Sequence, residues 1–416
     1  MNPNGERLRL FQGYGIELEY MLVDRTTLDV RSVADRLLTD SDGHPSGDRQ
    51  DGELTCSNEL TRHVIEVKTT DPAPSLSGLA DLFQAGIRRL DREAQAIGVC
   101  LMPTAMHPWM VPEQDTELWP HAGHEIYAAY DRVFDCRRHG WANLQSMHIN
   151  LPFADDAEFG RLHAAIRLLL PILPALAASS PVAESVITPW LDYRLQTYRN
   201  NSARVPSLTG QVIPERVYTQ ADYQREILDP IDRDMANRDP TGCLRGPFLN
   251  SRGAIARFDR GSIEIRVLDV QECPAADLAI AEFVCRAVEL LTRTSPLEYA
   301  RQQAFEVEPL VATFGDVIRQ GELAVIRDRR WLAMTGISSN GATAGEVWES
   351  LLTRIEREME PTALSRQATE RIRFLLTHGP LARRILRRLN GDLKELPNVY
   401  RELCQCLVDG RMFGNE

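Results

Sequence analysis

Two glutamates separated by a single residue are the strongest chemical signal in this 416-residue sequence. Glu17 and Glu19 lie in the motif Gly15-Ile16-Glu17-Leu18-Glu19-Tyr20, inside an apolar run that predicts a β-strand. Because side chains alternate along a strand, both carboxylates project from one face, about 7 Å apart, and the apolar residues project from the other. Burying two carboxylates costs on the order of several kcal/mol each unless a cation or hydrogen-bond donors compensate. If the pair is buried, a divalent metal ion is the natural compensation.

A solvated edge strand is the preferred explanation for a single pair of this kind, so recurrence of the pattern is what favours a metal site. An alternating run near residue 265 places Glu264 and Arg266 on one strand face. A second run near residue 149 places His148 and Asn150 on one face. Several predicted strands thus carry polar side chains of the same kind on one side.

Glu59 and Glu66 accompany a further β-rich segment, 58–69. Their odd spacing would put them on opposite faces of one regular strand. Both can reach the same site only if Glu59 lies before the strand or if a bulge intervenes.

Together these segments supply five carboxylates, one imidazole and one guanidinium. Oxygen-rich ligation with one histidine suits Mg²⁺, or Mn²⁺ as the alternative, better than Zn²⁺. Arginine beside such a metal suggests a phosphoryl group, since a guanidinium stabilises charge that develops on phosphoryl oxygens. The pattern therefore predicts ATP as a cofactor.

At this point the sequence resembles the glutamate-cysteine ligases and related carboxylate-amine ligases, which share the glutamine synthetase fold. The resemblance covers about residues 11–291 and is strongest in four pieces: Gly15-Ile16-Glu17-Leu18-Glu19, Glu59 with Glu66, Met147-His148-Ile149-Asn150, and Ile263-Glu264-Ile265-Arg266-Val267-Leu268-Asp269. It implies an ATP-dependent ligase that forms an amide. In such a reaction a carboxylate attacks the γ-phosphorus to give an acyl phosphate, and an amine then displaces phosphate.

The resemblance also implies a role for each residue. Glu17, His148 and Glu264 would hold the metal that bridges the ATP phosphates. Glu19, Glu59 and Glu66 would hold the metal near the acyl acceptor. Glu264 and Arg266 are the expected catalytic residues, and the expected nucleotide contacts are Arg266, Asn150 and, from a looser match around Tyr198-Arg199, Arg199.

The substrates are less closely specified by the resemblance. His148-Ile149-Asn150 is more similar to the glutamate-cysteine ligases of Gram-negative bacteria than to the branch that carries His-x-His-x-Gly. L-glutamate and L-cysteine, giving γ-glutamylcysteine, are therefore the default substrates. The alternatives are a ligase for another acid, amine or peptide, a phosphotransferase of the related guanidino kinase fold, and a non-catalytic nucleotide-binding regulator. The carboxylate set argues against the second, and the full set of matched residues against the third.

The composition of the chain limits the kinds of binding partner that we expect. A formal net charge of −12 argues against binding to nucleic acid or to an anionic membrane surface, and leaves small molecules as the expected partners. The apolar stretch 168–178 is too short for a bilayer and contains Pro171 and Pro174, so we expect a buried helix. Eight scattered cysteines and a polar start without a signal-peptide core indicate a cytoplasmic protein, and a homo-oligomer is compatible with the sequence.

The expected fold class is α+β. β-rich segments near 14–24, 61–69, 98–104, 145–152 and 254–270 are separated by helical stretches near 74–97, 125–138, 157–178 and 275–293. This irregular alternation predicts a mostly antiparallel sheet with helices on one face and the acids on the open face. We expect a catalytic domain over 1–339 and a helical subdomain over 340–416. Within the latter, Arg383, Arg384, Arg387 and Arg388 share one helix stripe, which is either a solvated face or a grip for phosphate or a partner.

Overall fold

An eight-stranded antiparallel sheet organises the computed structural model, which describes residues 7–239 and 242–414. Seven strands follow the order β2-β3-β4-β1-β6-β10-β9, and β5 pairs with the far end of β1. Their bounds are β1 (Gly15–Asp24), β2 (Asp48–Asp51), β3 (Leu54–Asn58), β4 (Val64–Thr69), β5 (Val99–Met102), β6 (Ser146–Pro152), β9 (Ala254–Arg257) and β10 (Ser262–Asp269). Each β-rich segment that the sequence predicts contains a strand, and 254–270 contains two, β9 and β10, whereas β2 and β3 were not predicted.

The central strand β1 shows why the sheet has two different faces. Ile16, Leu18 and Tyr20 are completely buried on the side that meets the helices. Glu17 and Glu19 project from the opposite side, as the alternation requires. Burial of the apolar side chains of each strand thus fixes the face from which its polar side chains project.

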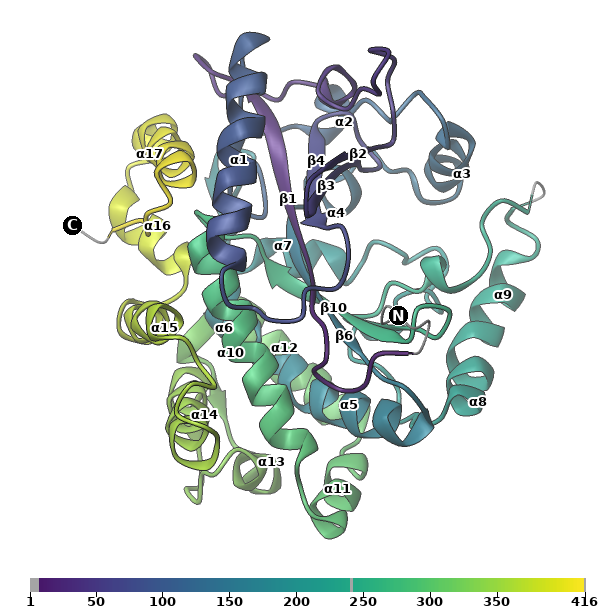
Figure 1. Cartoon of the computed structure of the whole chain (residues 1–416), viewed down its shortest axis with the longest axis vertical. Coiled ribbons are helices and arrows are strands. Elements are labelled where there is room, and N and C mark those ends of the chain that lie inside the picture. Colours follow the sequence, from purple (N-terminus) through teal and green to yellow (C-terminus); the bar gives the residue numbers. More distant parts are fainter. Residues whose placement is uncertain (1–6, 240–241, 415–416) are drawn as a thin grey trace.

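Helices α1 (Leu79–Ala96) and α10 (Pro274–Thr292) lie side by side across the apolar face of the sheet (Figure 1). α5 (Asp156–Leu169) and α6 (Pro174–Ala177) extend this layer. The single helix expected over 157–178 is therefore wrong in detail, because a 3₁₀ turn at Leu170–Ile172 separates the two. Pro171 and Pro174 lack the N–H groups that a continuous helix needs. The stretch is buried as expected.

Shorter helices connect the strands. They are α2 (Pro112–Asp115), α3 (His124–Phe134), α4 (His139–Ala142), α7 (Tyr193–Tyr198), α8 (Gln220–Tyr223) and α9 (Asp229–Met235), with α11 (Pro296–Gln303), α12 (Val307–Gln320) and α13 (Arg329–Met334) after α10. Two-stranded ribbons, β7 (Val182–Ala183) with β8 (Val186–Ile187) and β11 (Val325–Ile326) with β12 (Ala342–Thr343), complete the chain. Among the described residues, none of the helices has both the length and the apolar character needed to cross a bilayer.

Four helices form the C-terminal part: α14 (Ala344–Glu358), α15 (Arg366–His378), α16 (Leu381–Leu389) and α17 (Leu396–Asp409). They lie along one edge of the molecule, shown in yellow-green and yellow in Figure 1. Trp348 and Leu351 of α14 belong to the same continuous apolar core as the sheet. The α+β class is confirmed, whereas the division at residue 339 stays a prediction.

Candidate active site

Strand register brings the predicted polar residues together on the face of the sheet away from α1 and α10. Glu17 of β1 lies opposite His148 of β6, and Glu19 lies opposite Glu66 of β4. Glu264 of β10 lies opposite Asn150 of β6. Because directly paired residues of antiparallel strands share a face, four strands contribute to one polar surface.

Glu59 joins this surface from a loop. β3 ends at Asn58 and β4 begins at Val64, so Glu59 lies before the strand that carries Glu66. Of the two arrangements that the odd spacing of Glu59 and Glu66 allowed, the structure has the one in which Glu59 lies before the strand. No bulge is needed, because Glu59 lies in the connection between β3 and β4.

Two groups of acidic and imidazole ligands result. Glu19, Glu59 and Glu66 each offer an oxygen, and these atoms lie within 4.8 Å of one another. Glu17, Glu66 and His148 form a second group within the same limit. The first group coincides with the predicted second-metal set. The second group contains Glu66 where the resemblance implies Glu264, although Glu264 Oε1 also lies near, 3.9 Å from His148 Nδ1.

His148 connects the carboxylates of β1. Its Nδ1 lies 2.8 Å from Glu17 Oε2, and its Nε2 lies 2.9 Å from Ser146 Oγ, which also contacts Glu19. Burial disfavours the charged imidazole, but the hydrogen bond to Glu17 and the charges of Glu19 and Glu264 outweigh burial and raise the pKa of His148 to about 9. A bound cation would take the place of that proton.

Glu59 and Glu66 are electrostatically strained. Burial raises the pKa of Glu59 well above its usual range, and the nearby Glu19 and Glu66 raise it further. Burial and the charge of Glu17 also raise the pKa of Glu66, although Ser57 Oγ and Lys68 Nζ each donate to its Oε1 at 2.8 Å. Crowded, buried carboxylates with this donor set fit a divalent cation bound through oxygen.

Arg266 provides the positive charge beside the cluster. Its Nε lies 2.8 Å from Glu264 Oε1 but makes no hydrogen bond there, and 28% of the side chain is exposed. β10 is irregular between Ile265 and Leu268, where the register against β6 shifts. The Arg266 side chain also borders the cavity of the site, where its guanidinium can meet a substrate anion.

Part of this cluster borders a cavity of 220 Å³, whereas Glu17, Glu66 and Glu264 lie outside its lining. Its lining includes Glu19, Glu59, His148 and Arg266, together with rings from α3, α4 and α7, namely Tyr127, Tyr130, Trp141 and Tyr198. A cavity with a charged end and an aromatic wall can hold a small polar molecule and exclude water from its reacting group.

Arg194 also lines this cavity and was not predicted from the sequence. It is 1% exposed, and its Nε donates to the fully buried Asp269 at the end of β10. Ser179 and Ser180 donate to the other Asp269 oxygen at 2.8 and 3.0 Å. The only signal available in the sequence was Asp269 itself, which ends the Glu264 motif.

Arg199 lies outside the lining of this cavity. Its Nη1 lies 3.6 Å from the position that a Cβ on Gly315 of α12 would occupy. α7 turns Arg194 and Tyr198 toward the cavity, and Arg199 follows the last residue of that helix. The nucleotide contact that the resemblance implies for Arg199 stays a prediction.

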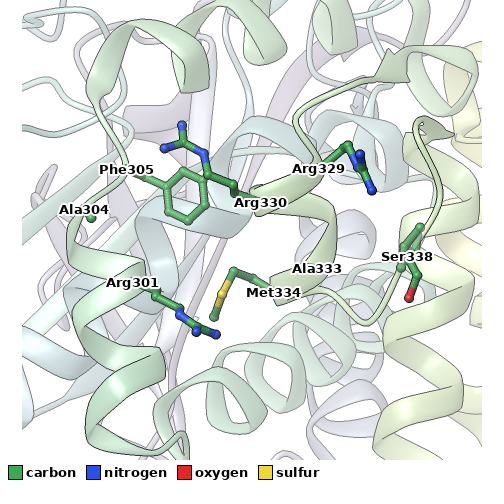
Figure 2. A pocket seen from close by; sticks show the side chains of 9 residues that line it. Arg301, Ala304, Phe305, Arg329, Arg330, Ala333, Met334 and Ser338 are labelled. Atoms are coloured by element: carbon green, nitrogen blue, oxygen red, sulfur yellow. The ribbon is translucent and has the colours of Figure 1, made fainter.

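A separate cavity of 560 Å³ lies between α11 and α13 (Figure 2). Phe305 and Met334 supply apolar surface, and Arg301, Arg329 and Arg330 surround it. It contains none of the acidic ligands. It is therefore not the metal-dependent site.

Comparisons with known proteins identify the family of the chain. The family model described as glutamate-cysteine ligase family 2 matches residues 14–402. An uncharacterized protein of Archaeoglobus fulgidus is 36% identical over 65% of this chain and 72% of its own length. A Bordetella avium protein provisionally named glutamate–cysteine ligase 2 is 30% identical, over 48% of this chain and less than half of its own length (46%).

A solved structure has the same fold. It is the glutamate–cysteine ligase of Francisella tularensis, in complex with AMP, with a TM-score of 0.61 and 15% identity over 97% of this chain and 90% of that one. Fold and family together define the class of the protein as that of ATP-dependent, amide-forming ligases. Within that class, the chain belongs to glutamate-cysteine ligase family 2, and the resemblance read from the sequence is confirmed.

Proposed function

We propose that this protein joins a carboxylate to an amine at the expense of ATP, through an acyl phosphate. The observation that carries the proposal is the convergence of Glu17, Glu19, Glu59, Glu66 and His148 around two ligand groups. The neighbouring Arg266 supplies a partly exposed guanidinium. The AMP bound to the Francisella ligase is consistent with a nucleotide at this fold.

The residues have distinct proposed roles. Glu17, His148 and Glu264 would hold the Mg²⁺ (or Mn²⁺) near the ATP phosphates, and Glu19, Glu59 and Glu66 a second ion near the acyl group. These ions would offset negative charge on the phosphoryl oxygens. Asn150, which donates to Glu17 Oε1 at 3.0 Å, would fix that carboxylate and contact the nucleotide. Arg266 would contact the γ-phosphate.

Two displacements complete the reaction. A substrate carboxylate oxygen attacks the γ-phosphorus, and the bond to the bridging oxygen of ADP breaks. The amine nitrogen then attacks the acyl carbon, phosphate leaves, and the amine loses a proton. Arg266 stabilises the negative charge that develops on the phosphoryl oxygens in the first step, where a guanidinium lowers the barrier most. No nucleophile on the protein is required.

L-glutamate and L-cysteine, giving γ-glutamylcysteine, are the first substrates to test, because family membership favours them. One observation favours a bulkier amine. A second cavity, of 460 Å³, shares Gly140, Trp141 and Asn201 with the first and adds Trp190 and Tyr193. An aromatic or peptide amine would use this added space.

The test measures Mg²⁺-dependent ADP release with a panel of amino acids, amines and short peptides, given singly and in pairs, with product masses determined. Release that needs glutamate plus one amine, with the matching amide mass, is expected. Glu264→Gln is the matched inactive control, since it keeps the side-chain shape and removes the charge. Nucleotide binding without turnover on any pair would instead favour a regulator.

A further inference from the structure

One further cation, Lys68, lies in the acidic cluster. Of the 47 lysines and arginines in the chain, only Lys68 and Lys394 are lysines. Lys68 pairs with Glu17 across β4 and β1, and directly paired residues of antiparallel strands share a face. The ammonium group therefore belongs to the polar face of the sheet, beside the carboxylate that would hold the metal near the ATP phosphates.

The ammonium group of Lys68 keeps unused hydrogen-bond donors. Its Nζ donates to Glu66 Oε1 at 2.8 Å, and Glu66 is the only hydrogen-bond or ion-pair partner of Nζ in the described parts of the chain. An ammonium group carries three N–H donors, so two of them remain. The Lys68 side chain is 32% exposed, compared with 6% for Glu66, so a ligand can reach these donors.

Lys68 and Arg266 flank the acidic cluster from opposite sides. In the strand order β4-β1-β6-β10, Glu17 pairs with Lys68 on one side and with His148 on the other. Arg266 of β10 falls level with His148, because the residue before Arg266 pairs with the residue after His148. The four residues thus form one row across four strands, with a cation at each end. At about 4.8 Å per strand, the two ends lie about 14 Å apart.

This row suits an extended anion that lies across β1 and β6. Phosphate oxygens accept hydrogen bonds from ammonium as well as guanidinium groups, and lysine binds them as a compact point charge. Arg266 is the proposed contact of the γ-phosphate at one end of the row. Lys68 stands at the other end with two donors and no second acceptor among the described residues.

We propose that Lys68 is a nucleotide-binding residue of this site, whose ammonium group donates to a phosphate oxygen of ATP. The inference rests on the proposed function, because it needs ATP phosphates at the metal held by Glu17. Lys68 holds the phosphate chain on the β4 side of the cluster, as Arg266 does on the β10 side. The hydrogen bond to Glu66 keeps the ammonium group in place before the nucleotide binds.

Calorimetric titration of the full-length protein with β,γ-imido-ATP, which cannot transfer its γ-phosphate, tests this contact at a Mg²⁺ concentration that saturates each variant. Lys68→Gln should weaken binding by about tenfold or more, the effect of losing a charged hydrogen bond. Lys394→Gln removes the other lysine, which is exposed, and should leave binding unchanged. Circular dichroism checks the fold of each variant.

Ser57→Ala separates a direct contact from an effect through Glu66. Ser57 Oγ donates to the same Glu66 oxygen as Lys68, so this variant reports what loss of a Glu66 partner does by itself. We expect a much smaller loss of nucleotide affinity than in Lys68→Gln. Equal losses in the two variants would overturn the inference, because Lys68 would then act only through Glu66.

Unchanged nucleotide binding in Lys68→Gln would also overturn the inference, even if ADP release by the parent protein confirmed the ligase. Conversely, binding that depends on Lys68 without ADP release on any substrate pair would contradict the ligase and leave the Lys68 contact standing. Absence of nucleotide binding by the parent protein would overturn both.

Discussion

At the scale of single residues, Glu66 has a central position because it belongs to both ligand groups. Its backbone pairing with Glu19 across β1 and β4 places two acids side by side. Ser57 and Lys68 donate to the same oxygen of Glu66. Such outer partners orient a ligand before a metal binds.

Ser57→Ala should therefore weaken Mg²⁺ binding, although it removes no ligand of the metal. We expect the Mg²⁺ concentration for half-maximal ADP release to rise by about tenfold or more, the usual effect of losing an outer partner. Thr55→Ala on the same strand is the control, because its hydroxyl meets Thr70 and no carboxylate. Equal responses of the two variants would remove Ser57 from this role.

Arg266→Ala should slow turnover far more than it weakens substrate binding. Loss of a guanidinium from a phosphoryl-transfer site costs on the order of 10³-fold in kcat. Arg257→Ala, on the neighbouring β9 and paired with the exposed Asp259, is the matched control. Steady-state ADP release measures both variants, and unchanged kcat in Arg266→Ala with native circular dichroism would contradict the assignment.

At the scale of elements, the position of the cavity wall depends on the contact between α7 and β10. Arg194 of α7 and Asp269 of β10 form a buried ion pair that Ser179 and Ser180 complete. The pair fixes the helix whose Tyr198 and Arg194 border the cavity. Burial makes this pair more consequential than the exposed ion pairs of the surface.

Asp269→Asn should destabilise the protein by about 3–5 kcal/mol, because it leaves the Arg194 charge buried and unpaired. Urea denaturation followed by circular dichroism measures the free energy of unfolding. Glu370→Gln breaks the exposed pair with Arg366 and should change it by less than about 1 kcal/mol. Similar losses of unfolding free energy in both variants would show that the buried ion pair stabilises the protein no more than an exposed one.

At the scale of the whole molecule, three buried histidines tie separate segments together. His63, His107 and His163 hydrogen-bond the carbonyls of Ala142, Leu28 and Val217 at 2.7 to 2.8 Å. Burial lowers the pKa of His63 and His107 to about 4, and burial together with Arg167 lowers the pKa of His163 to about 3. Each is neutral in the folded protein near neutral pH.

This arrangement predicts sensitivity to acid. Below about pH 6.5 the unfolded chain binds protons at these histidines and the folded chain does not, so stability falls as pH falls toward 4. Over this window His163 alone should cost about 1.4 kcal/mol per pH unit. His163→Gln should be less stable than the parent at pH 7.5 but should lose less between pH 6.5 and 4.5, as measured by urea denaturation. An equal loss in parent and variant would contradict this origin.

Much of the site could be predicted from the sequence, because its residues lie in strands where polar and apolar side chains alternate. Glu17 with Glu19, His148 with Asn150, and Glu264 with Arg266 each share a strand face for reasons of backbone geometry alone. The ligand types then indicated Mg²⁺ or Mn²⁺ and ATP. The apolar half of each strand similarly predicted the helix-covered face.

Other features depended on contacts between distant segments, which periodicity does not record. Glu59 reaches the cluster because β3 ends at Asn58 and a loop carries it there. Arg194 borders the cavity because Asp269, 75 residues away, holds it, while Arg199 lies beside α12. Arg384 became distinct from its neighbours on α16 only when Glu272 and the chain after α17 enclosed it.

The sequence by itself thus determined the central strands, the faces of those strands and the chemistry of the ligand set, since these follow from side-chain type and backbone period. Only the tertiary structure decided which strands pair, which arginines are buried and where cavities form. The physical reason is that burial, desolvation and ion pairing arise between segments that meet only after the chain folds.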